Sequence, residues 1–184
     1  MNSRSNCRYS SDALRGRGQL KADGRPDAVA VVVIRRTLRA STGSANTADV
    51  LLLRRARGAF AGAWTVVMGL VDGEERATDA ALRELREETG LRAAALYTAG
   101  ELDAFYDPVR DRIVHVPFFV VYADAGAAVV LEDAVHDEHR WVPFDEACRM
   151  VEFAAQRRVL GEIERAFVHD EPRPWRLIRG TSAE

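Results

Sequence analysis

The stretch from Gly69 to Leu91 reads GLVDGEERATDAALRELREETGL, and it decides how the rest of the chain is interpreted. Its second half predicts one short helix, because Thr78 can cap the start and Gly90 can follow the last turn. Asp79 falls in the first turn, where the helix dipole favours an anion. At about 100° per residue, three carboxylates of this helix project within an arc of roughly 100°. They are Glu84, Glu87 and Glu88.

This acidic face needs a compensating charge. Like charges at i and i+4, as in Glu84 and Glu88, weaken a helix by about 0.2–0.5 kcal/mol. Hard divalent cations such as Mg²⁺ take oxygen ligands and combine one or two carboxylates with substrate phosphates. The pattern therefore indicates either a metal that bridges the glutamates to a phosphate chain, or a solvated acidic surface.

Length and composition predict one domain and exclude several partners. With 184 residues, 47% of them hydrophobic, the chain can bury one substantial core. The 26 basic and 28 acidic residues nearly balance, which gives no electrostatic case for nucleic-acid binding. Any anionic ligand must then be held by a local site.

Several features predict a soluble, cytoplasmic protein with no membrane partner. Cys7 and Cys148 lie far apart, so a disulfide framework is not expected. No apolar run approaches the roughly 20 residues of a membrane span. Residues 1–27 are polar and lack the apolar core of a secretory signal, and we interpret them as a flexible extension.

The hydrophobic patterns beyond the acidic helix predict two hairpins and two further helices. Residues 28–34 form an apolar, β-branched run typical of a strand buried on both faces, and 50–54 give its hairpin partner. Residues 93–106 and 113–123 flank a turn and predict a second hairpin. A short strand is expected at 139–142, and helices at 144–151 and 156–168. Together these elements predict an α+β domain over residues 28–170, followed by a tail at 171–184.

The spacing of the central stretch resembles a known signature. Gly69, Glu75, Arg83-Glu84-Leu85, Glu87-Glu88 and Gly90-Leu91 match the full motif of the Nudix hydrolases without a gap. This resemblance implies an α/β/α layered sandwich, in which a mixed sheet lies between helices and a loop-helix-loop supplies the metal site. It also implies hydrolysis of a diphosphate bond by a metal-activated water.

The resemblance assigns roles within the motif. It implies that Glu84, Glu87 and Glu88 bind Mg²⁺, or alternatively Mn²⁺. Gly69 resembles the residue whose backbone carbonyl joins the metal shell, although a simple turn glycine is an equal alternative. Arg83 lies one turn before Glu87 and can orient it. Glu75 either touches the metal or supports the helix.

The general base is not fixed by the motif. Related enzymes carry a Glu-His pair before a strand tryptophan, but here Val135 precedes His136. Glu138 is a candidate substitute, and a motif glutamate that takes the proton itself is another possibility. The other acidic candidates in this loop are Glu132, Asp133 and Asp137. His136 either bonds a phosphate or is structural.

Residues before the motif bear on the substrate. Trp64, Val67, Gly69, Val71 and Asp72 are similar to the dihydroneopterin triphosphate and dATP pyrophosphohydrolase branch. Trp64 can stack on a base or anchor the loop to the core. One of three nearby arginines can reach a phosphate. They are Arg54, Arg55 and Arg57.

The sequence thus predicts a Mg²⁺-dependent pyrophosphohydrolase that acts on a small-molecule nucleotide. A nucleoside triphosphate is the first substrate hypothesis, and ADP-ribose or a nucleotide sugar is the second. The rival interpretation is a Nudix domain that binds nucleotides as a regulator without turnover. Related enzymes are often dimers, so the resemblance also allows a homodimer.

Overall fold

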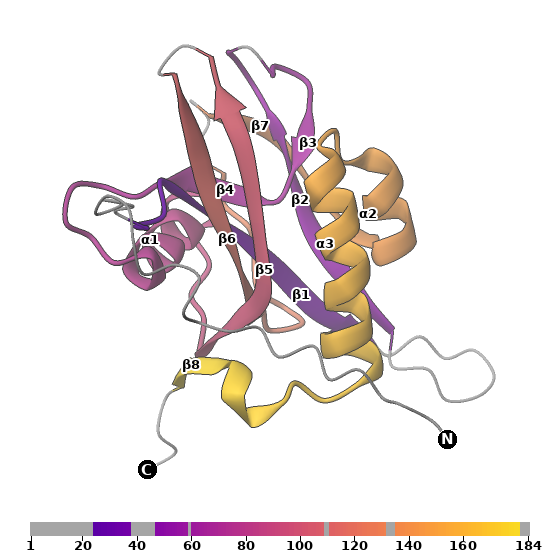
Figure 1. Cartoon of the computed structure of the whole chain (residues 1–184). Helices are drawn as coiled ribbons and strands as arrows, with labels where there is room; N and C mark the ends of the chain where they lie inside the picture. Colours follow the sequence, from indigo (N-terminus) through magenta and orange to yellow (C-terminus); the bar gives the residue numbers. More distant parts are fainter. Residues whose placement is uncertain (1–23, 38–46, 59, 109–110, 132–134, 181–184) are drawn as a thin grey trace, which may run out of the picture.

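The computed structural model describes residues 24–37, 47–58, 60–108, 111–131 and 135–180. Within them, eight strands form one sheet, flanked by three α-helices (Figure 1). The strands are β1 (Ala28–Thr37), β2 (Thr47–Arg55), β3 (Trp64–Thr65), β4 (Val67–Leu70), β5 (Ala95–Asp107), β6 (Arg112–Tyr122), β7 (His136–Pro143) and β8 (Leu177–Gly180). The helices are α1 (Ala77–Thr89), α2 (Phe144–Met150) and α3 (Ala154–Glu164), with a π-helical turn η2 (Arg165–His169) and a 3₁₀ turn η3 (Pro174–Arg176).

The sheet is mixed because β1 runs parallel to β6, whereas the other pairs of neighbouring strands are antiparallel. The main strand order is β3-β2-β1-β6-β5-β8. Along one edge, β1 changes partner: its second half pairs with β2, and its first half pairs with β4. The short strand β4, which opens the acidic motif, therefore lies beside the central strand.

Alternate residues of β1 enter two separate cores, and this produces the layered sandwich. Val29, Val31 and Val33 pack on one face with Ala81 and Leu85 of α1. The intervening β1 residues pack on the other face against Val159, Leu160 and Ile163 of α3. The predicted α/β/α architecture is confirmed, and so is the prediction that residues 28–34 form a strand buried on both faces.

Both predicted hairpins are confirmed. β1 pairs with β2, and β5 with β6, each in antiparallel register. The strand expected at 139–142 is longer and begins at His136, because β7 pairs with β2 as far as Arg55. The segment set apart as a tail contains η3 and β8, and β8 pairs with β5.

The start of the chain is described only from residue 24, so most of the predicted flexible extension lies outside the described residues. Arg25 donates a hydrogen bond to Glu74. Asp27 bonds both to β6 and to the loop after β4. In the described part of the chain, no helix is long and apolar enough to cross a membrane.

The acidic helix begins slightly earlier than predicted. Its first hydrogen bonds run to the carbonyl of Arg76, from the N–H groups of Asp79 and Ala80. Thr78 therefore lies inside the first turn, and the prediction that it caps the helix is wrong. Gly90 ends the helix as predicted, in the left-handed conformation, and its N–H reaches the Arg86 carbonyl.

Candidate active site

The Glu84 carboxylate lies over Gly69, in the place that a side chain at Gly69 would occupy. Gly69 lies in β4, paired with Val29, while Leu85 anchors α1 in the core below the sheet. A Cβ added to Gly69 would lie 1.8 Å from the carboxylate carbon of Glu84. The alternative of a turn glycine is therefore wrong, because this is a strand residue over which a carboxylate is folded.

Arg83 gathers the acidic groups of the motif. Its Nη1 lies 2.7 Å from Glu84 Oε1 and 3.0 Å from Glu87 Oε2. Its Nη2 donates to Glu75 Oε2 at 3.0 Å and to the Leu70 carbonyl at 2.9 Å. The hydrogen bond with Glu75 is the main cause that raises the pKa of Arg83, and it lowers the pKa of Glu75. One cation thus ties helix, loop and strand together.

Glu84 and Glu87, the two glutamates that contact Nη1 of Arg83, differ in environment. The Glu84 side chain is 13% exposed, and burial raises its pKa even though Arg83 opposes the shift. Glu87 is 43% exposed and faces the solvent side of the same guanidinium. Glu84 is therefore the carboxylate that would gain most from an added cation, and Glu87 is the one that a substrate in solution can reach.

Glu88 points in a different direction from its two neighbours. Its side chain is buried, and Oε2 accepts a hydrogen bond from the Met68 N–H of β4 at 3.3 Å. Its Oε1 lies 3.9 Å from Nδ1 of His136, a buried atom that has no hydrogen-bond partner in the described part of the chain. Burial, helped by the positive charge of Arg55, lowers the pKa of His136 to about 4, so the ring is neutral at pH 7.

The donor set fits a hard cation. Among the residues that the structure describes, no three His, Cys, Asp or Glu side chains are already gathered to hold a metal ion. The guanidinium nitrogen of Arg83, however, stands between Glu84 and Glu87, at a place where positive charge is stabilised. All the predicted donors are oxygens, as Mg²⁺ requires. Glu84 and Glu87 would hold the ion, with Glu88 and the Gly69 carbonyl as the further predicted donors.

Several predicted substrate residues lie on β2, β3 and β7 and already have partners. Arg54 bonds Asp137 at 2.8 Å and Glu138 at 3.0 Å. Glu138, the candidate base, also binds Arg140 at 2.7 Å. Arg140 stacks over the Trp64 ring at 4.9 Å, and Trp64 packs against the core. Glu138 is therefore held between two guanidinium groups, and Trp64 anchors its strand.

The remaining predicted residues are two arginines and two of the alternative bases. Arg55 is half-buried, and its Nε has no hydrogen-bond partner among the residues that the structure describes. Arg57 is exposed. Glu132 and Asp133, two of the alternative bases, lie outside the described residues.

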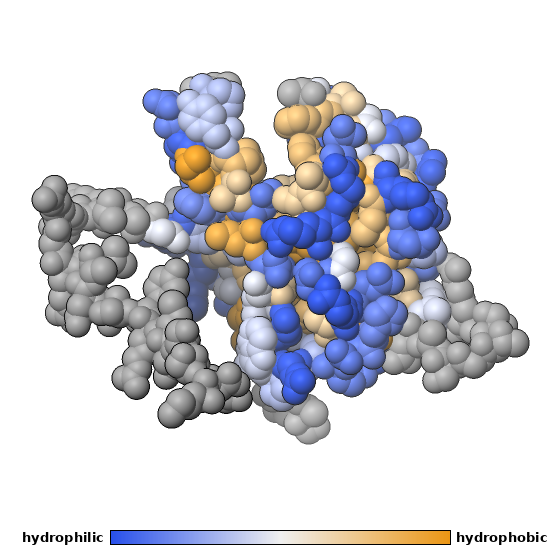
Figure 2. Space-filling view, turned by 45° about the vertical axis from the view of Figure 1, so that its right-hand side comes forward, coloured by the Kyte–Doolittle hydropathy of each residue, from blue (hydrophilic) through white to orange (hydrophobic). Residues whose placement is uncertain are grey.

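An open notch lies between two raised hairpins. The β5–β6 hairpin and the β2–β3 connection both stand above the rest of the molecule, and a gap separates them (Figure 2). In the sheet, β1 lies between these hairpins and pairs with β4, so the strand that carries Gly69 lies between them as well. The motif therefore begins on a strand that both hairpins flank.

The rims carry exposed aromatic side chains that the motif did not reveal. Phe105 and Tyr106 of β5 are 47% and 56% exposed, and Phe60 in the β2–β3 connection is 51% exposed. The Tyr106 hydroxyl donates to Asp111 at 2.8 Å. In the sequence, Tyr106 lies fifteen residues after Leu91, near a position that marks dinucleoside polyphosphate enzymes of the family, but that spacing does not fit cleanly. Phe60 lies in a loop of small residues that carries no such signal.

Comparisons with known proteins identify related sequences and related folds. The NUDIX domain model matches residues 24–164. Over 140 residues, the chain is 30% identical to the bis(5'-nucleosyl)-tetraphosphatase (asymmetrical) of Rattus norvegicus, covering 73% of this chain and 90% of that one. The C. elegans Ap4A hydrolase binary complex has a TM-score of 0.61 at 19% identity, over 75% of this chain and 94% of that chain. The E. coli dihydroneopterin triphosphate pyrophosphohydrolase has a TM-score of 0.56 at 18% identity, over 73% and 92%.

Fold, site and relatives together define an α/β/α hydrolase of phosphoric anhydride bonds. The chain belongs to the Nudix family. The resemblance seen in the sequence is therefore confirmed over most of the folded domain.

Proposed function

We propose that this Nudix protein is a Mg²⁺-dependent pyrophosphohydrolase whose substrate is a nucleoside polyphosphate. One observation carries the proposal: Arg83 draws Glu84 and Glu87 together, and the missing side chain of Gly69 leaves room for the Glu84 carboxylate. A phosphate chain entering between the hairpins would meet this paired acidic site, and a divalent cation would neutralise both.

Each motif residue then has a defined task. Bound Mg²⁺ would neutralise phosphate oxygens and lower the pKa of a water molecule. Arg83 orients the carboxylates of Glu84 and Glu87, and Glu75 holds Arg83 in place from the loop. Glu138 is occupied by Arg54 and Arg140, which favours proton removal by a carboxylate oxygen of a motif glutamate.

A dinucleoside tetraphosphate now becomes the first substrate hypothesis, ahead of the nucleoside triphosphate expected from the sequence. The support is the similarity to asymmetrical bis(5'-nucleosyl)-tetraphosphatases, together with aromatic side chains on both rims of the notch. Aromatic faces can stack on a nucleobase and contribute about 1–3 kcal/mol each. A nucleoside triphosphate is the second hypothesis, favoured by the pattern of Trp64, Val67 and Asp72.

A panel of nucleotides, incubated with Mg²⁺ and analysed by mass spectrometry, tests the proposal. Asymmetrical cleavage of a dinucleoside tetraphosphate releases one triphosphate and one monophosphate. Pyrophosphate with a monophosphate would instead support the triphosphate hypothesis. A monophosphate with a sugar phosphate would support ADP-ribose or a nucleotide sugar.

The substitution Glu87→Gln tests the role of the motif. We expect hydrolysis to fall by at least about 100-fold with little change in thermal unfolding, because Glu87 is partly exposed. Glu74→Gln is the matched control, since Glu74 is another glutamate of the motif region, lies in the loop before α1 and has a side chain that is 93% exposed. A Glu87→Gln protein that retains most of its activity would remove the mechanism. Nucleotide binding without turnover in the wild type would favour the regulator.

A further inference from the structure

The β5–β6 hairpin leaves the sheet at an irregular point in β5. Thr98 pairs with Phe119 and Leu102 pairs with Pro117, so β5 uses four steps where β6 uses two. Two extra residues therefore bulge from β5 at the base of the hairpin. Gly100 lies within the bulge with φ of +73°, a conformation that other residues rarely adopt. A bulge bends a strand, so its geometry sets the angle of everything beyond it.

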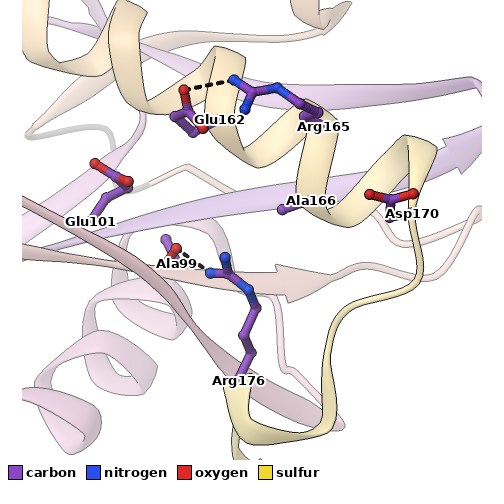
Figure 3. A pocket seen from close by; sticks show the side chains of 7 residues that line it. All are labelled: Ala99, Glu101, Glu162, Arg165, Ala166, Asp170 and Arg176. Atoms are coloured by element: carbon purple, nitrogen blue, oxygen red, sulfur yellow. Dashed lines mark hydrogen bonds and ion pairs between the residues drawn. The ribbon is translucent and has the colours of Figure 1, made fainter. Parts of the chain in front are cut away.

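Two arginines from the C-terminal part of the chain hold this bulge. Arg176 of η3 donates through Nη1 to the carbonyl oxygens of Thr98 and Ala99. Figure 3 shows its guanidinium bonded to Ala99, and both residues line a hollow of about 210 Å³. A Cβ on Gly100 would lie only 3.1 Å from the same Nη1. The guanidinium and the glycine are thus fitted to each other.

Arg158 holds the other side of the bulge. From α3 it forms an ion pair with Glu101 and donates to the Leu102 carbonyl at 3.3 Å. Arg176 is itself fixed by stacking over the Phe167 ring at 5.3 Å. Because an unpaired carbonyl in a bulge otherwise needs water or another donor, these two side chains fix the bent conformation.

The hairpin beyond the bulge is also connected to the motif loop. Asp27 accepts a hydrogen bond from the His115 N–H of β6 at 2.9 Å, and its Oδ1 lies 2.9 Å from Nη1 of Arg112. The carbonyl of Asp27 accepts a hydrogen bond from Val71, two residues after Gly69. The hairpin therefore has one attachment near the acidic site and a second at the bulge.

We propose that Arg158 and Arg176 are positioning residues for substrate binding, which clamp the β5 bulge and so set the width of the notch. Neither residue belongs to the acidic motif. The proposal rests on the proposed function in one respect, namely that a nucleotide occupies the notch. Loosening the clamp lets the rim that carries Phe105 and Tyr106 move, while the motif glutamates on α1 keep their places.

The experiment compares the double variant Arg158→Gln, Arg176→Gln with the wild type. We expect KM to rise about tenfold with kcat changed less than twofold, because the rim binds substrate without touching the reacting phosphates. When Arg176→Lys replaces Arg176→Gln in the double variant, KM should return part of the way to the wild-type value. An ammonium can still donate a hydrogen bond to a carbonyl. Hydrogen exchange should accelerate at residues 103–107 and 113–116 and stay unchanged at 28–34.

Two matched controls separate the clamp from simpler effects. Arg165→Gln removes another arginine of the same hollow, one that pairs with Glu162 and not with the bulge. Arg179→Gln removes the ion pair between Arg179 of β8 and Asp79 of α1. It loosens β8 without removing a contact to the bulge. Both should behave as wild type in KM and in exchange of the hairpin.

The outcomes are distinguishable from failure of the proposed function. If the wild type hydrolyses no nucleotide, the proposed function fails, and hairpin exchange alone then decides whether the clamp exists. Unchanged exchange in the double variant would overturn the clamp. Faster exchange with an unchanged KM in an active enzyme would overturn its role in substrate binding.

Discussion

Replacing Gly69 by alanine should separate catalysis from stability. The new Cβ would lie 1.8 Å from the carboxylate carbon of Glu84, and 2.0 and 2.2 Å from its two oxygens. Ordinary van der Waals contact begins at 3.4 Å, so the carboxylate must retreat by about 1.6 Å. A misplacement of about 1 Å in an active site can cost on the order of 100-fold in rate. We therefore expect kcat to fall at least about 100-fold, equivalent to about 2.7 kcal/mol.

The same substitution should leave the fold nearly intact, because the clashing group is the end of a flexible side chain. Loss of the Glu84 bond to Arg83 costs about 1 kcal/mol, and replacing a strand glycine by alanine recovers roughly 0.5–1 kcal/mol. The free energy of unfolding, measured by urea denaturation, should thus change by less than about 1 kcal/mol. Steady-state hydrolysis on the same preparations gives the catalytic half of the comparison.

Gly161→Ala is the matched control. Gly161 lies within α3, and a Cβ there would meet no atom within 4 Å. We expect unchanged hydrolysis and a gain in unfolding free energy of about 0.5–1 kcal/mol. A Gly69→Ala protein with more than about half of wild-type activity would refute the requirement for the close approach. A loss of more than about 3 kcal/mol in stability would refute the claim that Glu84 can simply swing aside.

Two further predictions follow from the charges of the site. Arg83→Met removes the counter-charge of Glu75, Glu84 and Glu87, so without metal the free energy of unfolding should fall by about 1–3 kcal/mol. Added Mg²⁺ should then raise the melting temperature of the variant more than that of the wild type. If Mg²⁺ and EDTA shift the melting temperatures of both proteins equally, Arg83 and the cation do not neutralise the same carboxylates. His136 is buried and neutral with its pKa lowered to about 4, so the unfolded chain takes up its proton first as the pH falls from about 6.5 to 4. Folding stability should decline across this window by at most about 3 kcal/mol, and denaturation of His136→Asn should show a shallower decline.

Local sequence patterns predicted the strands and helices whose own residues show a clear hydrophobic period. The apolar, β-branched run of β1 and the 3.6-residue period of α1 set their burial by themselves, and the cores confirm them. Thr78 was misplaced as the cap because the first carbonyl that accepts a helix bond is that of Arg76, and no side chain bonds to the helix start at that N-cap.

Contacts between distant residues could not be read from the sequence. Glu88 shares a helical face with Glu84, yet it turns to Met68 and His136 because β4 and β7 are close to that end of α1. The edge strand β8 pairs Gly180 with Ala95, a match that no local pattern encodes. Glu138 looked available as a base, but Arg54 and Arg140 come to it from β2 and β7.

The separation between the exposed hairpin ends and the buried anchor of the acidic helix has an evolutionary consequence. The rims that border the notch are formed by hairpin ends, whereas the acidic helix is anchored through Ala80, Ala81 and Leu85 in a core without solvent contact. Exchanging an exposed rim residue disturbs few neighbours, and exchanging an anchor disturbs many. Descendants of such a domain can therefore diversify in the molecules they accept while inheriting one unaltered apparatus for breaking the anhydride.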